Sequence, residues 1–424
     1  MAQQQKLHNY WFALGREKLL SAAEISAFFK LSKATVLEIK EKNIFFSRIE
    51  NDLLFKQGIL KLETAKKIDA HEWMSKLGGT IKIAEQINQE MKRDEIENVI
   101  AQELMEVKGK IVFGISCYGS VARNARDAGR LALNVKKILK QKGRSVRVVP
   151  NKESALSSSV VANNHLTEKG GEFLIALIGS NRYSLAKTIC VQPFVQFSKR
   201  DYGRPMRDDF SGMIPPKLAM MMINLAGIKD GTILDPFCGS GTIISEAILL
   251  GYSDLLASDL SLKAVDDCKE NINWIVNNYP VNSAKYSVKQ VDVKKASVEY
   301  GANSVDAIIT EPYLGRPLKG NESKERLEAQ TRELGTLYLS AFREFKKILC
   351  KNGVVVIIIP RFKFSNDWVR ISIGEKIKEL GFKAEPLLDN HEFLLYHRPN
   401  QRVAREIWKF VKCLHENSTH PRLG

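Results

Sequence analysis

The 424-residue sequence lacks long hydrophobic runs, paired cysteines and an apolar N-terminal signal. Apolar runs such as residues 353–360 have the length of a strand and are far too short to cross a membrane. The six cysteines form no C-x-x-C pair and the seven histidines show no ligand spacing, so neither a disulfide framework nor a metal site is expected. We therefore expect a cytoplasmic protein with reduced, buried thiols.

The basic charge of the chain is concentrated in one segment. The net charge is +16, and residues 101–200 carry 17 Lys and Arg against 6 Asp and Glu. Such a local excess is typical of a surface that binds a polyanion such as nucleic acid, although a solubilising surface is the plain alternative. A chain of this length also suggests two or three domains.

A Gly-rich turn lies near the middle of the chain, at Thr232-Ile-Leu-Asp-Pro-Phe-Cys-Gly-Ser-Gly-Thr242. The apolar start and the apolar pattern that follows predict strand, tight turn and helix. The turn lacks the G-x-G-x-x-G spacing of dinucleotide binders and the G-K-[ST] of phosphate loops. It resembles the cofactor loop of S-adenosylmethionine (SAM) methyltransferases, which implies S-adenosyl-L-methionine as the cofactor; a turn without a ligand is the alternative.

Strand-like and helix-like segments alternate from residue 231 onward, which predicts an α/β fold with a mainly parallel, doubly wound sheet of the Rossmann-like class I methyltransferase type. Near the C-terminus we expect a helix over 368–380, an edge hairpin formed by 383–388 and 393–397, and a basic helix over 401–413. Acidic residues end the first three strands, where a carboxylate can meet the methionine end, the ribose and the adenine of the cofactor. Strand-end acids are also common helix caps. The expected cofactor site comprises Asp235, Pro236, Cys238, Gly239, Gly241, Thr242, Asp259, Leu260, Asp292 and Val293.

The fourth strand ends in Thr310-Glu311-Pro312-Tyr313, which resembles the [DNS]-P-P-[YFW] element of methyltransferases that modify exocyclic amines. In that family a side-chain oxygen and a main-chain carbonyl accept hydrogen bonds from the target amine, and the aromatic ring stacks on the base. Thr310 occupies the acid-or-amide position and is a weaker acceptor than a carboxylate. Glu311 is therefore the expected amine ligand and Tyr313 the stacking platform, with Thr310 shaping the turn; a purely structural turn remains the alternative.

The N-terminal half resembles a ferredoxin-like unit (1–65) followed by a THUMP domain (66–180), with a linker (181–212) before the methyltransferase domain (213–424). The resemblance to THUMP rests on Arg147–Pro150, Leu156–Ser158 and Leu166–Phe173. It implies that an amphipathic basic helix over 123–142 and the serine segment bind tRNA. The Arg-rich stretch 199–209 can contact phosphate and a base, or serve as a plain linker. The expected RNA-binding residues are Arg126, Arg130, Arg144, Arg147, Ser157, Ser158, Arg200, Arg204 and Arg207.

As a whole, the chain resembles the THUMP-containing tRNA guanosine-N2 methyltransferases, which act on guanosine 10 of tRNA. The resemblance implies tRNA as partner and leaves open mono- or dimethylation and a need for a small activating subunit. The rivals are an rRNA or DNA amino-methyltransferase, because the fourth-strand motif is shared with adenine-N6 enzymes, and an RNA-binding protein whose methyltransferase domain has decayed.

Overall fold

The computed structural model describes residues 7–32, 52–121, 125–207, 213–281, 283–399 and 401–413. Residues 35–39 and 44–48, where the sequence also suggests strands, lie outside these ranges. The chain divides into two compact units, residues 1–22 with 33–196 and residues 23–32 with 197–424. The boundary between the two units falls within helix α1 (Lys18–Ser32) and again within helix α9 (Phe194–Tyr202).

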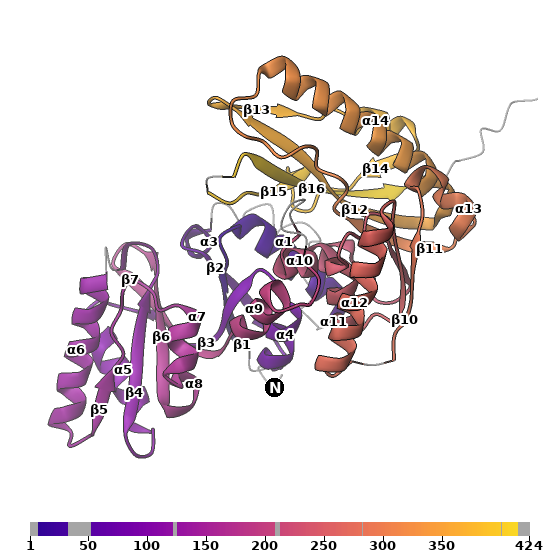
Figure 1. Cartoon of the computed structure of the whole chain (residues 1–424). Coiled ribbons are helices and arrows are strands. Elements are labelled where there is room, and N and C mark those ends of the chain that lie inside the picture. Colours follow the sequence, from indigo (N-terminus) through magenta and orange to yellow (C-terminus); the bar gives the residue numbers. More distant parts are fainter. Residues whose placement is uncertain are drawn as a thin grey trace, which may run out of the picture. The chain divides into compact units, whose positions relative to one another are not determined.

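The N-terminal unit is built on one seven-stranded sheet, in the order β2-β1-β3-β7-β6-β4-β5. This sheet contains strands from both the predicted ferredoxin-like and the predicted THUMP segments (Figure 1). Residues 182–191, predicted as the start of a linker, form strand β7 between β3 and β6, because the consecutive residues Ser184, Leu185 and Ala186 are fully buried. The strands are β1 (His8–Leu14), β2 (Ile59–Thr64), β3 (Thr80–Met91), β4 (Ile111–Cys117), β5 (Val146–Val148), β6 (Gly170–Gly179) and β7 (Arg182–Val191).

Helices cover this sheet, among them two amphipathic ones whose apolar sides share a core with β4 and β6. Helix α6 confirms the predicted basic amphipathic helix: Leu131, Val135 and Leu139 are buried, whereas Arg126 and Arg130 are exposed. The helical segments are α3 (Leu53–Lys56), α4 (Ala70–Lys76), α5 (Ile96–Met105), the 3-10 turn η2 (Gly119–Val121), α6 (Ala125–Gln141), α7 (Ser158–Asn163) and α8 (Leu166–Lys169).

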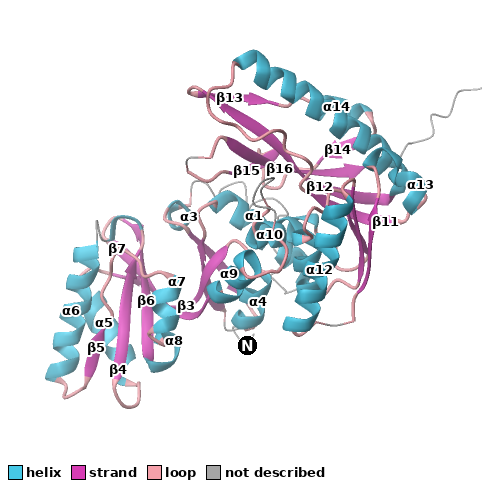
Figure 2. Cartoon of the chain, viewed as in Figure 1, coloured by secondary structure: helices cyan, strands magenta, loops and turns pink. Residues whose placement is uncertain are grey.

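The C-terminal unit contains the predicted parallel sheet, in the order β10-β9-β8-β11-β12-β16-β14. Figure 2 shows its strands β11, β12 and β14 in magenta and the long helix α14 in cyan. The first five strands of this order run parallel, and β16 pairs antiparallel with β12. The strands are β8 (Thr232–Asp235), β9 (Asp254–Asp259), β10 (Lys285–Gln290), β11 (Val305–Thr310), β12 (Leu349–Phe364), β13 (Asp367–Arg370), β14 (Phe382–Ala384), β15 (Phe393–Tyr396) and β16 (Val403–Lys412).

Helix α10 packs against α11 and β12, and the long helix α14 packs against β12 and β13. The strand order confirms the doubly wound α/β fold, because helices connect neighbouring parallel strands: α11 joins β8 to β9, α12 joins β9 to β10, and α14 joins β11 to β12. The helical segments are α10 (Pro216–Ala226), α11 (Thr242–Leu250), α12 (Leu262–Asn278), η3 (Val293–Lys295), α13 (Ala296–Tyr300), α14 (Lys324–Ile348) and α15 (Gly374–Glu379).

Three sequence-based expectations at the C-terminal end were wrong. Residues 403–412 form strand β16 instead of a helix. Consecutive residues of this strand are buried, and it pairs with β12 along one edge and with β14 and β15 along the other. Residues 368–380 form β13 and α15, because a turn with Ser365 at φ 52° folds the chain back onto β12. Strands β14 and β15 each pair with β16 and do not form a hairpin with each other.

Candidate functional site

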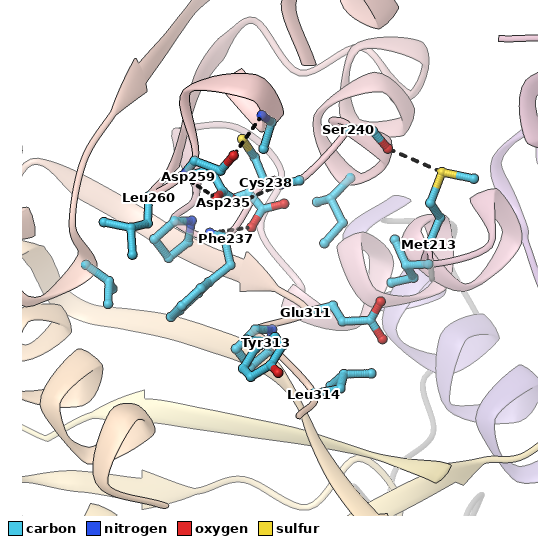
Figure 3. A pocket seen from close by; sticks show the side chains of 18 of the residues that line it. Met213, Asp235, Phe237, Cys238, Ser240, Asp259, Leu260, Glu311, Tyr313 and Leu314 are labelled. Carbon is cyan, nitrogen blue, oxygen red and sulfur yellow. Dashed lines mark hydrogen bonds between the residues drawn. The ribbon is translucent and has the colours of Figure 1, made fainter. Parts of the chain in front are cut away.

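A pocket of about 610 Å³ opens at the carboxyl ends of the parallel strands of the C-terminal unit. The segments that follow β8, β9, β10 and β11 all line it, as expected for a ligand site in an open α/β sheet. Figure 3 shows Glu311 and Tyr313 on one side of the pocket and the turn with Asp235 and Phe237 on the other. The pocket therefore brings the predicted cofactor and catalytic motifs together.

The two glycines of the turn have different roles. Gly239 lies at φ 49°, and a Cβ atom added to it would meet nothing within 4 Å, so its main chain borders the open pocket. A ligand can approach this main chain closely because no side chain is present. Gly241 lies at φ 81° at the start of α11, where an added Cβ would come within 2.6 Å of the Cys268 sulfur. Gly241 thus permits the turn to pack on α12, whereas Gly239 permits access.

The predicted ribose ligand, Asp259, is fixed by the main chain. Its carboxylate accepts hydrogen bonds from the Gly239 N–H at 3.0 Å and the Ser261 N–H at 2.9 Å. Each carboxylate oxygen retains a second lone pair, so the group can still accept hydroxyl donors. Leu260 also lines the pocket and is 68% exposed, which leaves an apolar surface available to a flat ring. This pair of neighbours suits a ribose and an adjoining base.

Asp292 and Val293 follow β10 on the same rim of the pocket. The Asp292 carboxylate caps η3 by accepting the Lys294 N–H at 3.0 Å. The cap accounts for one oxygen of Asp292, as expected for a strand-end acid, and leaves the other available to the pocket. Pro236, Cys238 and Thr242 complete the predicted residues that line the pocket.

Asp235 lies almost fully buried at the end of β8. The Thr310 hydroxyl at the end of β11 donates to its Oδ1 at 2.6 Å, and the Phe237 N–H donates to the same atom at 3.2 Å. Burial raises the pKa of Asp235 to about 7, against the lowering effect of these hydrogen bonds and with the help of the Asp259 and Glu311 charges. Thr310 is fully buried and does not itself line the pocket, so its oxygen is directed at Asp235.

Glu311 forms an ion pair that its sequence context did not reveal. The Arg405 Nε donates to Glu311 Oε1 at 2.5 Å, and each side chain is only 11% exposed. Burial alone would lower the pKa of Arg405, but the Glu311 carboxylate raises it above the ordinary value. The Arg405 guanidinium thus holds Glu311 Oε1, and among the described residues no donor bonds to Glu311 Oε2, on a side chain that lines the pocket.

The loop after Glu311 is held by a buried tyrosine. The Tyr338 hydroxyl of α14 donates to the Tyr313 main-chain oxygen at 2.7 Å, while the Tyr313 ring is 53% exposed at the pocket. Pro312, between the two predicted ligands, is buried. A fixed main chain under an exposed ring is the arrangement that a stacking platform needs.

Sequence reasoning missed several residues of the site. Phe237 and Ser240 lie within the recognised turn and line the pocket together with Met213. Phe237 was detectable, because an aromatic ring stood inside the motif itself. Arg405 was not, since it lies 94 residues from Glu311 in a segment that the sequence suggested was helical.

Two of the connector arginines proposed as RNA ligands are buried in the C-terminal unit instead. Arg200 forms a two-pronged ion pair with Glu246 of α11, at 2.7 and 3.1 Å. Arg204 donates to the Thr242 hydroxyl at the start of α11 and to the Met213 sulfur. Both side chains are 7% exposed, so in this conformation they do not reach RNA and instead fix the connector beside the pocket. Arg207 is exposed, with its guanidinium 5.4 Å from the Tyr202 ring centroid.

The predicted RNA ligands of the N-terminal unit differ in accessibility. Arg126, Arg130 and Arg147 are exposed, and Arg147 donates to the Asn164 side chain at 3.0 Å. Arg144, in contrast, donates to the carbonyls of Met105, Val107 and Gly109, which follow or end helix α5. Such a cation satisfies helix-end carbonyls, so its role here is structural.

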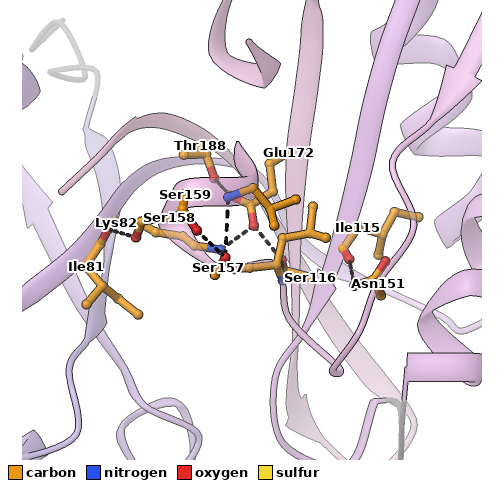
Figure 4. Close-up of polar contacts among 12 residues, drawn as sticks. Ile81, Lys82, Ile115, Ser116, Asn151, Ser157, Ser158, Ser159, Glu172 and Thr188 are labelled. Atoms are coloured by element: carbon orange, nitrogen blue, oxygen red, sulfur yellow. Dashed lines mark hydrogen bonds and ion pairs between the residues drawn. The ribbon is translucent and has the colours of Figure 1, made fainter. Parts of the chain in front are cut away.

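The serine segment is held onto the sheet by a buried polar network (Figure 4). The Lys82 ammonium forms an ion pair with Glu172 and donates to the Leu156 carbonyl at 2.7 Å. Glu172 also accepts from Thr188 at 2.7 Å and from Ser116. Burial alone would lower the pKa of Lys82, but the Glu172 carboxylate raises it above the ordinary value, so the Lys82 ammonium keeps its charge.

This network fixes the main chain just before the two serines. Ser157 caps helix α7 by accepting the Val160 N–H, and the Ser158 hydroxyl donates to the Ile81 carbonyl at 3.1 Å. Ser157 is exposed and Ser158 is half-buried. Of the two, Ser157 is the more accessible to a ligand.

Comparison with known proteins assigns the C-terminal unit. Residues 204–380 match the family model described as RMKL-like, methyltransferase domain (UPF0020). The match covers 177 of the 424 residues. The methyltransferase predicted from the turn is thereby confirmed, and S-adenosylmethionine is the methyl donor of such a domain. The chain is also similar to the crystal structure of TrmN from Thermus thermophilus, with a TM-score of 0.52 and 15% identity over 96% of this chain and 100% of that one, which shows the fold alone.

Two archaeal relatives match part of the chain. A tRNA (guanine(10)-N2)-dimethyltransferase of Methanothermobacter thermautotrophicus is 30% identical over 168 residues, which cover 39% of this chain and 46% of that protein. A protein of the same name from Methanocaldococcus jannaschii is 34% identical over 140 residues, or 31% of this chain and 38% of that protein. The chain thus spans less than half the length of these two relatives.

The pocket fits S-adenosylmethionine in its chemistry. The open main chain at Gly239 admits a ligand, and Asp259 offers two oxygens suited to the ribose diol. With the cofactor bound, Asp235 would offer its buried carboxylate to the cationic methionine end, and Asp292 with Val293 would border the adenine. Among the residues that the structure describes, no helix is long and apolar enough to span a membrane.

Proposed function

We propose that this protein transfers a methyl group from S-adenosylmethionine to the exocyclic N2 of a guanosine in tRNA, at position 10. The observation that carries the proposal is the position of Glu311 and Tyr313 on the same pocket as Asp235 and Asp259. The names of the two archaeal relatives support tRNA guanosine 10 as the target. The work of the enzyme on tRNA would place it in the cytoplasm.

Glu311 acts as the acceptor that orients the target amine. Its Oε1 is held by Arg405, and Oε2 accepts a hydrogen bond from the N2 amine, which aims the nitrogen lone pair at the methyl donor. Tyr313 stacks on the guanine that has been turned out of the RNA. When bound, S-adenosylmethionine would supply the methyl group and leave as S-adenosylhomocysteine. The amine would then release its proton to water, so Glu311 need not act as a strong base.

The N-terminal unit anchors the tRNA in this proposal, with the THUMP segment at 66–180 and the ferredoxin-like segment at 1–65. Its exposed cations Arg126, Arg130 and Arg147 contact phosphates, and Ser157 offers a hydroxyl and a helix start. A backbone-directed contact of this kind positions the RNA without reading its sequence. The target guanosine is then selected by its distance from the part of the tRNA that the N-terminal unit holds.

The test is methyl transfer by the purified full-length protein. The protein is incubated with S-adenosylmethionine and unmodified tRNA transcript, and the nucleosides are separated by mass spectrometry. N2-methylguanosine or N2-dimethylguanosine is the expected product, and Tyr313→Ala should abolish it. Unmodified tRNA beside methylated rRNA or DNA would contradict the proposal. Activity of the protein alone also decides whether a small activating subunit is needed.

A further inference from the structure

The C-terminal unit carries a hairpin that projects beyond the methyltransferase pocket. Strand β12 pairs in parallel with β11, and Thr310, the last residue of β11, lies opposite Ile357. Strand β12 continues to Phe364 and pairs there with β13. At about 3.3 Å per residue, the seven further residues reach roughly 20 Å past the end of β11, on the edge where the pocket opens.

The hairpin carries a tryptophan, Trp368, whose ring lies close to two cationic side chains. The Arg361 guanidinium lies 4.7 Å and the Lys363 ammonium 5.2 Å from the Trp368 ring centroid. The His397 ring meets the same tryptophan edge-on at 5.3 Å. Contact with a ring face restrains a long side chain and reduces the entropy that it would lose on binding.

Within the described residues these two cations form no ion pair of their own, although the Glu406 carboxylate attracts Arg361, whose pKa is lowered chiefly by burial. Neither the Arg361 nor the Lys363 side chain forms a hydrogen bond or ion pair with a residue in the described ranges, whereas the nearby Glu406 is engaged by Arg370 at 2.7 and 3.2 Å. The nearby Asp367 carboxylate accepts the Trp368 N–H at 2.7 Å. A guanidinium and an ammonium held in place without carboxylate partners suit phosphate groups.

A continuous path joins this cluster to the catalytic loop. The loop that begins with Tyr313 reaches Gly320, which lies so close to the Arg402 guanidinium that an added Cβ would fall within 2.2 Å of its Cζ. The Arg402 carbonyl in turn accepts the Lys363 N–H at 2.8 Å. A groove of about 510 Å³ lies beside Trp368, between the hairpin tip and the start of α14, and has room for a nucleotide. Lys324 lines it together with the Glu328 and Asp367 carboxylates, so the phosphates would lie toward Arg361 and Lys363 outside this groove.

We propose that Arg361, Lys363, Trp368 and Arg402, named here the hairpin surface, bind the RNA phosphates that flank the target nucleotide. The inference rests on the proposed function, because that function places RNA at Tyr313. The methyltransferase unit thus grips the substrate locally, in addition to the anchoring by the N-terminal unit. Trp368 is a positioning residue that holds the two cations.

The test compares two double variants of the full-length protein. R361Q/K363Q removes the two cations of the hairpin surface, and R343Q/K351Q removes two exposed cations on α14 and at the opposite end of β12. Binding of fluorescent tRNA is followed by anisotropy at several salt concentrations. R361Q/K363Q should raise the Kd about tenfold and reduce the slope of log Kd against log salt by about 1.4 to 1.8, since each lost phosphate contact removes about 0.7 to 0.9.

The control variant should bind tRNA like the wild type, and all variants should bind S-adenosylmethionine equally. W368F should retain the tRNA affinity, whereas W368L should lower it several-fold. If Trp368 only stabilised the folded hairpin, the two variants would not differ in tRNA affinity. Equal Kd and salt slope for the two double variants would overturn the hairpin surface. Failure of the wild type to methylate tRNA would instead contradict the proposed function, and the binding comparison would remain readable.

Discussion

The Thr310 hydroxyl donates a hydrogen bond of 2.6 Å to the Asp235 carboxylate, across the ends of the neighbouring strands β11 and β8. This bond joins the start of the cofactor turn to the start of the catalytic loop. It also directs the Thr310 oxygen away from a substrate amine, because the hydroxyl donates to a buried acid. In the proposed function the acceptor role therefore belongs to the next residue, Glu311, whose side chain lines the pocket.

The raised pKa of Asp235 predicts that cofactor affinity depends on pH. Only the ionised carboxylate attracts the cationic methionine end, so S-adenosylmethionine affinity should increase with pH up to the pKa of about 7 and then level off. Well below that pKa the increase should approach about tenfold per pH unit. Calorimetric titration from pH 5.5 to 8.5 measures it, and Asp235→Asn should give a flat, weak response. An equal pH dependence in that variant would contradict the assignment.

The same group predicts the opposite trend for the stability of the ligand-free protein. The folded-state pKa of Asp235 lies above the ordinary carboxyl value, so the folded state binds the proton more tightly than the unfolded state. Its contribution to the free energy of unfolding is present below the unfolded pKa and is lost as the pH rises through about 7. Urea unfolding at pH 6 and pH 8 should show a smaller decrease for Asp235→Asn than for the wild type. A decrease of the same size in both proteins would remove Asp235 from this account.

Arg405 should act on the methyl-transfer step through Glu311. Arg405→Met leaves the Glu311 carboxylate without its partner and lets it rotate, so kcat should fall about 10- to 100-fold, the range for a lost charged hydrogen bond. The KM for tRNA should change little, and Arg405→Lys should recover part of kcat. A change confined to KM would argue against a positioning role.

Asp259 should affect the cofactor and not the RNA. Asp259→Ala removes the expected ribose acceptor and should weaken S-adenosylmethionine binding about 10- to 100-fold while tRNA affinity is unchanged. The matched control is Asp254→Ala, at the opposite end of the same strand. Calorimetry measures the first quantity and anisotropy the second. Unchanged cofactor affinity would count against Asp259 as the ribose ligand.

The cations of the N-terminal unit should bind tRNA by charge alone. Replacing Arg126, Arg130 and Arg147 with glutamine should weaken tRNA binding and lower the salt slope by about two to three units. Arg144→Gln should leave the slope unchanged, because its guanidinium is engaged by main-chain carbonyls. A salt-independent affinity in the wild-type protein would contradict the electrostatic anchor.

The parts of the molecule that sequence predicts well are those whose signals are local. The turn from Asp235 to Thr242 and the acids at strand ends stand next to the strands that position them, and parallel strands bring their ends to one edge. The amphipathic pattern of α6 likewise needs only its own residues.

The features that sequence did not predict depend on distant partners. Arg405 meets Glu311 only because β16 inserts beside β12, and the buried sides of β16 look helical in isolation. The sequence suggests that Arg200 and Arg204 face solvent, but they bond to Glu246 and Thr242 of α11 and are buried. In both cases tertiary packing decides which partner these arginines meet and whether they are buried, so local sequence patterns cannot predict it.

The most direct test of the central claim replaces a single nucleotide of the substrate. A tRNA with guanosine at position 10 and the same tRNA with inosine there differ by the exocyclic N2 amine. With labelled S-adenosylmethionine, the protein should methylate the guanosine substrate and leave the inosine substrate unlabelled while binding both with equal affinity. Equal labelling of the two tRNAs would contradict the assignment of Glu311 and Tyr313 to a guanine N2 at this position.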